Sequence, residues 1–162
     1  MPSHSETRTL PFTARQMYDL VADVGRYPEF LPWCSDSALV SRGENELCGM
    51  IEVSRLGIRQ AFTTCNTLAP PERMGIALHE GPFRHLHGEW RFVELRDDAC
   101  KVMLTMEFEF AGRLIDAAFG KVFHQVANSL VESFVARETS HGRLVQPAAY
   151  TPSTSVDPST KP

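Results

Sequence analysis

Two pairs of residues have the types and the spacing that acid–base or metal chemistry would need. His85 and His87 lie two positions apart, and so do Glu107 and Glu109. Residues two positions apart in a strand point to the same face, so each pair could act together. Zinc requires a third or fourth ligand nearby, and none accompanies the histidines, which we interpret as unliganded. The two glutamates alternate with apolar residues, so we expect them to face water and not a catalytic pocket.

The motifs of common catalytic and nucleotide-binding sites are absent from the sequence. It contains no GxSxG, GxxxxGK[ST], GxGxxG or HExxH, the patterns that build nucleophile elbows, phosphate loops, dinucleotide sites and zinc proteases. No nucleophile stands in a recognisable arrangement with a base. We therefore expect no catalytic residue, no metal and no cofactor, and a protein that is not an enzyme.

Cysteine usage and the N-terminus bear on the compartment. The chain has four cysteines without a CxxC pair, at positions 34, 48, 65 and 100, and its first ten residues contain no apolar signal region. No stretch approaches the ~18 consecutive apolar residues of a spanning helix. We expect a cytoplasmic protein, at most peripheral to the inner membrane. In a reducing compartment the four cysteines are predicted to be small core residues, without a disulfide or zinc.

Size and charge limit the remaining function classes. The chain has 162 residues, of which 43% are hydrophobic and 22% charged. One domain of this length buries roughly 70% of the surface of the unfolded chain, so it can form a stable core without metals or disulfides. The net charge of −4 argues against binding nucleic acid through bulk charge, and we expect no DNA partner.

The first part of the chain predicts a strand and two helices. Residues 4–10 can form a strand. Thr13 and Gln16 form a T-x-x-Q capping box, which predicts a helix over 13–24. In the following segment Pro28 suits the first turn of a second, short helix, and Pro32 should end it.

In the middle of the chain, apolar residues recur at every second position. Apolar and polar residues alternate over 100–110, and turn residues such as Gly57 separate the segments. Because these turns are short, neighbouring strands should pair as antiparallel hairpins. The predicted strands are 36–42, 46–56, 58–68, 73–79, 86–96 and 100–110.

A long helix is predicted over 113–141, with Gly142 as its stop. It would be about 40 Å long. Its apolar residues come in pairs every four positions, so the apolar stripe drifts around the helix, as packing inside a curved sheet requires. Strands and helices are segregated, which indicates an α+β fold. Residues 1–145 would form the domain, and the Pro/Ser/Thr-rich segment 146–162 a disordered tail.

Several segments resemble one known family. They are Tyr18–Val24, Tyr27–Cys34, Glu80–Leu86, Phe108–Phe110 and Phe119–Phe123. Together they resemble the coenzyme Q-binding START-like family of the polyketide cyclase/dehydrase-like superfamily, which also contains the RatA group of bacterial ribosome-association toxins. The resemblance spans about residues 4–142. It implies a helix-grip (START/Bet v 1-like) fold, in which about seven antiparallel strands curve around the C-terminal helix and two short helices follow the first strand.

The resemblance also implies a function: binding of a polyprenyl quinone such as ubiquinone between sheet and helix, as a carrier that supports respiration. Exchange of this lipid would involve transient membrane contact. Two alternatives stay open. One is a RatA-type toxin that binds the large ribosomal subunit and blocks subunit association, with rim arginines such as Arg26, Arg84, Arg91 and Arg113 on RNA phosphate. The other is a cyclase- or dehydratase-like enzyme. The predicted cavity residues are Tyr27, Phe30, Trp33, Phe83, Arg84, Phe108, Phe110, Leu114, Phe119, Val122, Phe123 and Val126.

Overall fold

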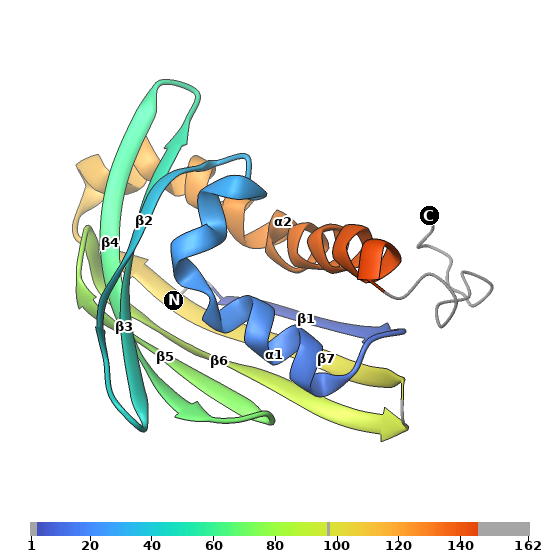
Figure 1. The fold of residues 1–162 in the computed structure, drawn as a ribbon. Coiled ribbons are helices and arrows are strands. Elements are labelled where there is room, and N and C mark those ends of the chain that lie inside the picture. The colour runs from blue at the N-terminus through green and yellow to red at the C-terminus, as the bar shows by residue number, and fades with distance from the viewer. Residues whose placement is uncertain (1–2, 97, 146–162) are drawn as a thin grey trace.

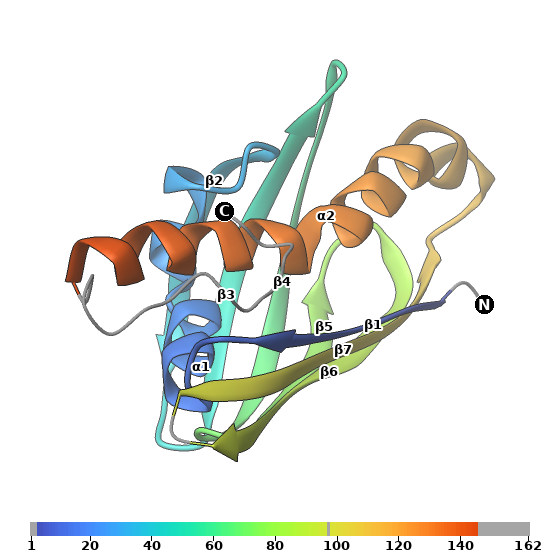
Figure 2. The ribbon, with the colours of Figure 1, turned by 90° about the vertical axis from the view of Figure 1, so that its right-hand side faces the viewer.

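Seven antiparallel strands curve around one long helix in the computed structural model, which describes residues 3–96 and 98–145 (Figure 1). The strand order is β1-β7-β6-β5-β4-β3-β2. Figure 2 shows the long helix α2 lying across the concave side of the sheet. The elements are β1 (Ser3–Leu10), α1 (Ala14–Ala22), the 3₁₀ helix η1 (Val24–Glu29), β2 (Cys34–Arg42), β3 (Glu46–Arg55), β4 (Ile58–Ala69), β5 (Arg73–Glu80), β6 (Phe83–Arg96), β7 (Ala99–Phe110) and α2 (Arg113–Val145). The α+β helix-grip prediction is confirmed.

The first helix begins as predicted and ends earlier. The backbone N–H of Gln16 donates to Thr13 Oγ1 at 3.0 Å, and Thr13 N donates to Gln16 Oε1 at 2.7 Å, which completes the capping box. The helix ends at Ala22, and η1 follows directly. Val24 and Tyr27 are both buried, and a repeat of three residues per turn places them on one face. Pro28 therefore lies near the end of this turn, not in its first turn as predicted.

The long helix was predicted to stop before Gly142, and that boundary is wrong. Helix α2 continues to Val145. A glycine within a helix costs only ~1 kcal/mol relative to alanine, so it does not by itself terminate a helix of this length. The predicted disordered tail, residues 146–162, lies outside the described residues.

The sheet is bent where strands slip out of register. Pairing between β6 and β7 shifts between Phe83 and His85, and again between Glu94 and Arg96. A bulge of this kind kinks a strand and increases its twist. The bends let β6 and β7 curve beneath α2 (Figure 2). This curvature matches the drifting apolar stripe of the helix.

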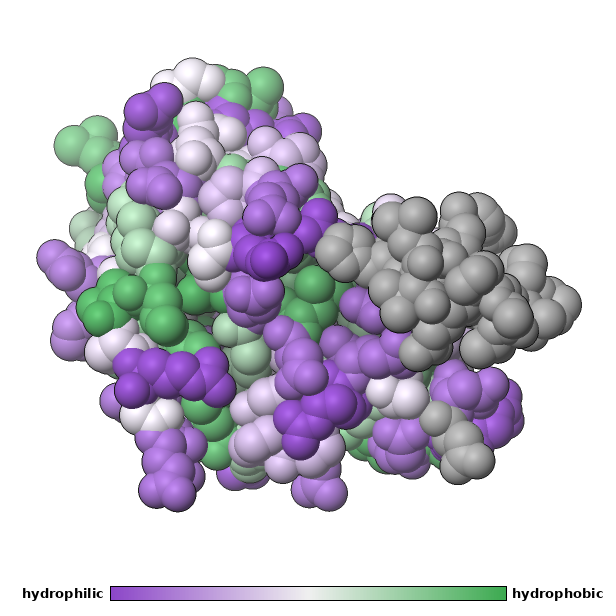
Figure 3. Space-filling view, in the orientation of Figure 1, coloured by the Kyte–Doolittle hydropathy of each residue, from purple (hydrophilic) through white to green (hydrophobic). Residues whose placement is uncertain are grey.

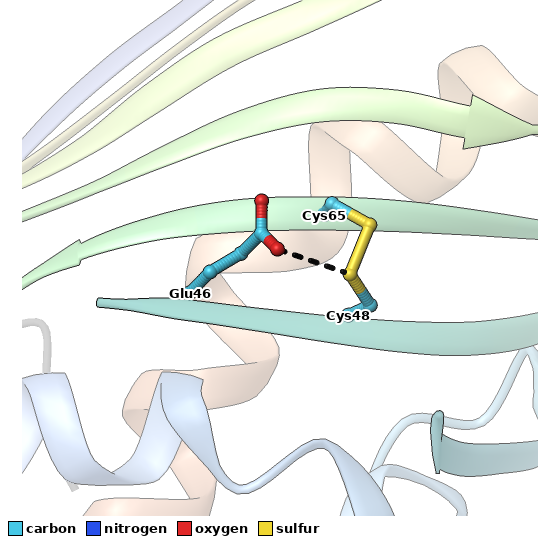
Figure 4. The surroundings of a disulfide bond; sticks show 3 residues. All are labelled: Glu46, Cys48 and Cys65. Atoms are coloured by element: carbon cyan, nitrogen blue, oxygen red, sulfur yellow. Dashed lines mark hydrogen bonds between the residues drawn. A yellow bond between two sulfur atoms is a disulfide. The ribbon is translucent and has the colours of Figure 1, made fainter. Parts of the chain in front are cut away.

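Two of the four cysteines form a disulfide, contrary to the prediction. Cys48 of β3 and Cys65 of β4 face each other in the strand register and are bonded (Figure 4). The carboxylate of Glu46 lies 3.9 Å from the Cys48 sulfur. Cys34 and Cys100 are buried free thiols, as predicted. Burial raises the pKa of Cys34 to about 11 and that of Cys100 to about 12, so both stay protonated and unreactive.

Removing the disulfide should cost measurable stability. Its two cysteines are 17 residues apart, and closing a loop of this length in the unfolded chain is worth about 3 kcal/mol. We expect Cys65→Ser to lower the free energy of unfolding by about 2–3 kcal/mol, measured by urea denaturation. The wild-type protein in excess dithiothreitol should match the variant. Identical curves for the variant and the oxidised wild type would show that the bond contributes nothing.

Candidate functional site

Six phenylalanines fill the space between the sheet and the first half of α2. They come from β4, β6, β7 and α2, and all are buried. Ring centroids lie 4.9 Å apart for Phe108 and Phe123, and 5.0 Å for Phe83 and Phe123. Edge-to-face and offset contacts at such distances are those of a packed aromatic core. We call these residues the phenylalanine cluster: Phe62, Phe83, Phe108, Phe110, Phe119 and Phe123.

The structure brings most of the predicted cavity residues to this region. Val122 and Val126 are buried on the same helix as Phe119 and Phe123. Phe62, which the sequence interpretation omitted, joins the cluster through contacts with Phe83 and Phe123. Phe62 lies outside the segments that resemble the known family, and the alternation of residues in a strand does not show which face of β4 is turned to the helix.

Two predicted cavity residues lie at the surface. Leu114 is 86% exposed: it lies in the first turn of α2, where its neighbour Ile115, and not Leu114, packs against the core. Arg84 is also exposed, and its Nη1 pairs with Glu109 Oε2 at 3.2 Å. That pair keeps the guanidinium outside the core, so Arg84 is not a donor to an internal ligand.

A second aromatic group joins η1 to the second half of α2. The ring of Phe134 lies 5.4 Å from Tyr27, 5.4 Å from Phe30 and 5.6 Å from Trp90. The Tyr27 hydroxyl donates to the backbone carbonyl of Val21, and burial raises its pKa. The predicted cavity residues Tyr27 and Phe30 therefore pack on the helix, and Phe134, absent from the prediction, is their common contact.

Arg137 of α2 also contacts η1 and the residue that follows it. Its Nη2 lies 2.6 Å from Glu29 Oε1, and its guanidinium carbon is 4.9 Å from the centre of the Phe30 ring. A cation over an aromatic face adds to the attraction of the ion pair. Any opening of η1 away from α2 has to break both contacts.

Trp33, a predicted cavity residue, has a buried donor without a partner among the described residues. Trp33 is 4% exposed, and its indole Nε1–H has no hydrogen-bond partner in the described part of the chain. Buried donors are nearly always paired. This N–H could donate to a carbonyl oxygen of a ligand held between sheet and helix.

The charged pairs noted in the sequence lie on the outer face of the sheet. His87 Nε2 is 3.0 Å from Glu107 Oε1, and both side chains are more than half exposed. Over residues 3–96 and 98–140, only Glu46, Cys48 and Cys65 are grouped closely enough to hold a metal. Both sulfurs of that group are bonded to each other in the disulfide and do not bind a metal. Neither this group nor the exposed histidine and glutamate pairs therefore form a metal centre or an acid–base dyad.

Glu138 gives the stability a pH dependence. Its carboxylate accepts from Gln16 Nε2 at 3.3 Å. Burial raises its pKa from the ordinary 4.5 to about 7, Arg137 opposes this shift and Asp19 adds to it. The folded state therefore holds this proton more tightly than the unfolded state, so stability falls as pH rises from about 4.5 to about 7.

Replacing Glu138 by glutamine should remove that slope. The group is partly exposed, so screening reduces its contribution. We expect Glu138→Gln to raise the free energy of unfolding by about 1 kcal/mol at pH 8 and to change it little at pH 4. Urea denaturation between pH 4 and 8 measures both. A variant that keeps the wild-type slope would assign the pH dependence to other groups.

Comparison with known proteins identifies a family and several relatives of this chain. Residues 10–135 match the family described as polyketide cyclase/dehydrase and lipid transport. The chain is 42% identical over 137 residues to the ribosome association toxin RatA of Vibrio cholerae, which covers 85% of this chain and 95% of that protein. It is 30% identical over 145 residues to the mitochondrial coenzyme Q-binding protein COQ10 homolog B of Xenopus laevis, which covers 87% of this chain and 58% of that protein.

A solved structure with the same fold is the Zhui aromatase/cyclase from Streptomyces sp. R1128. It superposes with a TM-score of 0.72 over 91% of this chain and 98% of that chain, at 17% identity. At this identity the likeness shows the fold alone. No helix of the described residues is long and apolar enough to cross a membrane.

Proposed function

The chain belongs to the polyketide cyclase/dehydrase and lipid transport family, and from this membership we propose that it associates with ribosomes, through the large subunit. The observation that carries the proposal is the 42% identity to RatA of Vibrio cholerae over 95% of that protein. A match of this extent spans most of this chain and nearly all of that relative, which supports a shared role.

The arginines first considered for RNA contact are mostly neutralised. Arg26 pairs with Asp23, Arg84 with Glu109 and Arg91 with Glu89. A guanidinium that already faces a carboxylate gains less from a phosphate, because its own partner must be displaced. Of the four suggested rim arginines, Arg113 alone has no acidic partner among the described residues.

A different basic surface supports the proposal better. Arg55 and Arg59 flank the β3–β4 turn, and Arg55 Nε donates to Gln125 Oε1 of α2 at 2.8 Å. Lys121 lies one turn before Gln125 on the same helix face. None of the three cations has an acidic partner in the described part of the chain. Arg55 and Lys121 therefore form a small basic surface suited to RNA phosphate, whereas Arg59, which pairs with Ser54 in the strand register, points to the other face of the hairpin.

Sedimentation of purified ribosomes with the added protein tests the proposal. We expect the protein to sediment with the large subunit, with an affinity that falls as salt rises. The double variant R55Q/K121Q should weaken binding and reduce the slope of log affinity against log salt by about two. The matched control R84Q/R91Q, which removes two ion-paired arginines, should leave the slope unchanged. Absence of the protein from every ribosomal fraction would refute the proposal.

A second function, binding of a polyprenyl quinone, is favoured by the unpartnered Trp33 N–H in an apolar interior. The relative named as a coenzyme Q-binding protein supports it. The prenyl chain would have to separate the rings of the phenylalanine cluster, and the indole would donate to a quinone carbonyl. Quinone titration followed by tryptophan fluorescence, with mass spectrometry of lipids extracted from the protein, tests this function. Trp33→Phe should weaken binding, and the absence of saturable quenching and of extracted lipid would exclude it.

A further inference from the structure

An open pocket of about 400 Å³ lies on the face formed by α1, β2 and the turn between β4 and β5. It is separate from the phenylalanine cluster. Figure 3 shows this face, with hydrophobic side chains gathered over β2 and hydrophilic ones around them. Ala22, Val24, Leu39 and Pro70 provide its apolar walls. A volume of this order suits a small organic molecule.

One residue that lines the pocket has a buried hydroxyl without a partner among the residues that the structure describes. Tyr18 lines it and is 2% exposed, yet its hydroxyl has no hydrogen-bond partner in the described residues. The ring is held edge-on against Phe92, with centroids 5.7 Å apart. Burial raises the pKa of Tyr18, although Arg42 and Arg15 oppose the shift. The hydroxyl is therefore protonated at neutral pH and can donate.

One arginine of the pocket has no acidic partner among the described residues. Arg15 Nη1 lies 3.3 Å from Asp19 Oδ1, and Asp23 Oδ2 lies 3.5 Å from Nε of Arg26, which is outside the pocket lining. Arg42, at the end of β2, has no acidic partner in the described part of the chain. A single unpaired guanidinium suits one negative group, and the carboxylates of Asp19 and Asp23 disfavour a ligand with several.

We propose that this pocket binds a small organic monoanion, such as an aromatic carboxylate. Its carboxylate accepts hydrogen bonds from the Arg42 guanidinium and the Tyr18 hydroxyl, which gives the orphan donor its partner. Its apolar body lies against Leu39 and Pro70. This binding site is independent of ribosome association and of quinone binding.

Titration of the ¹⁵N-labelled full chain with benzoate, followed by amide chemical shifts, tests the site. We expect saturable shifts at the amides that line the pocket, including Gly25, and benzoate binding at least about tenfold tighter than benzamide, its neutral analogue. Phenyl phosphate as the dianion should bind more weakly than benzoate. Arg42→Gln should weaken benzoate binding about tenfold and Tyr18→Phe about threefold or more. The control Arg91→Gln, on the outer face, should leave it unchanged.

Three outcomes would overturn the proposal. Equal binding of benzoate and benzamide would show that no charge is recognised. Unchanged benzoate binding in both Arg42→Gln and Tyr18→Phe would place the anion elsewhere. Concentration-dependent shifts of the same amides without benzoate would show that a carboxylate from a second copy of the chain occupies the pocket. Circular dichroism of each variant verifies that it is folded.

Discussion

Replacing Phe123 by alanine is expected to lower the free energy of unfolding by about 3–5 kcal/mol, measured by urea denaturation. Phe123 is buried at the centre of the phenylalanine cluster, 4.9 Å from Phe108 and 5.0 Å from Phe83. Truncation removes the transfer free energy of the ring and leaves a cavity whose walls belong to both sheet and helix. The ring also contacts Phe62, Phe110 and Phe119.

Leu114→Ala is the matched control for this prediction. Leu114 is an apolar α2 residue that the sequence placed in the same cavity, but it is 86% exposed. Its truncation should change stability by no more than about 0.5 kcal/mol. A loss below about 1 kcal/mol for Phe123→Ala, together with tighter binding of an apolar ligand, would contradict the packed core. It would show instead that the rings line a space already open to ligand.

The sequence predicted the fold well because the spacing of apolar residues and the positions of turn residues indicate the same elements along most of the chain. The alternation over 100–110 correctly placed Phe108 and Phe110 inside and Glu107 outside. The helix of 33 residues was recognised from its apolar pairs, although its end was not. Those pairs record which residues are apolar, not which member of a pair faces the sheet, and of Leu114 and Ile115 only Ile115 packs on the core. Leu114 was misplaced for this reason.

The disulfide was missed because it depends on strand register. Cys48 and Cys65 become partners only when the β3–β4 hairpin turns at Leu56 and Gly57, whose φ angles are 55° and 80°. Two positive φ values are typical of a type I′ turn, which the dipeptides Asn-Gly and Asp-Gly signal most clearly. A leucine at the first position gives no such signal. Gly57 therefore indicated a turn without fixing the register across it.

The contacts that define the pocket were likewise beyond sequence reasoning. Tyr18, Leu39 and Pro70 come from three separate elements, and only the curvature of the sheet brings them together. That Arg42 has no acidic partner among the described residues depends on the position of every acidic side chain in the folded protein. The spacing of residues along the chain shows neither the contacts that form the pocket nor the missing partner of Arg42.

Gly88→Ala should be about as damaging as loss of a core ring. A Cβ at this position would lie 2.1 Å from the backbone oxygen of Thr105 and 3.0 Å from the Cα of Met106. Both are backbone atoms of β7, the partner strand, so no side-chain rotation relieves the clash. Strands β6 and β7 would have to separate where Gly88 pairs with Met106. We expect a loss on the order of 3 kcal/mol in the free energy of unfolding.

Gly75→Ala provides the matched control, because it also adds one methyl group to a glycine in this sheet. Its Cβ would meet Thr67 Cβ at 3.6 Å, an ordinary van der Waals contact. The substitution should change stability by no more than about 0.5 kcal/mol, since alanine also restricts the unfolded chain. Thermal denaturation of both variants gives the comparison. Equal stability of the two would mean that β6 and β7 are not held at this close approach, and that the curvature enclosing α2 has another origin.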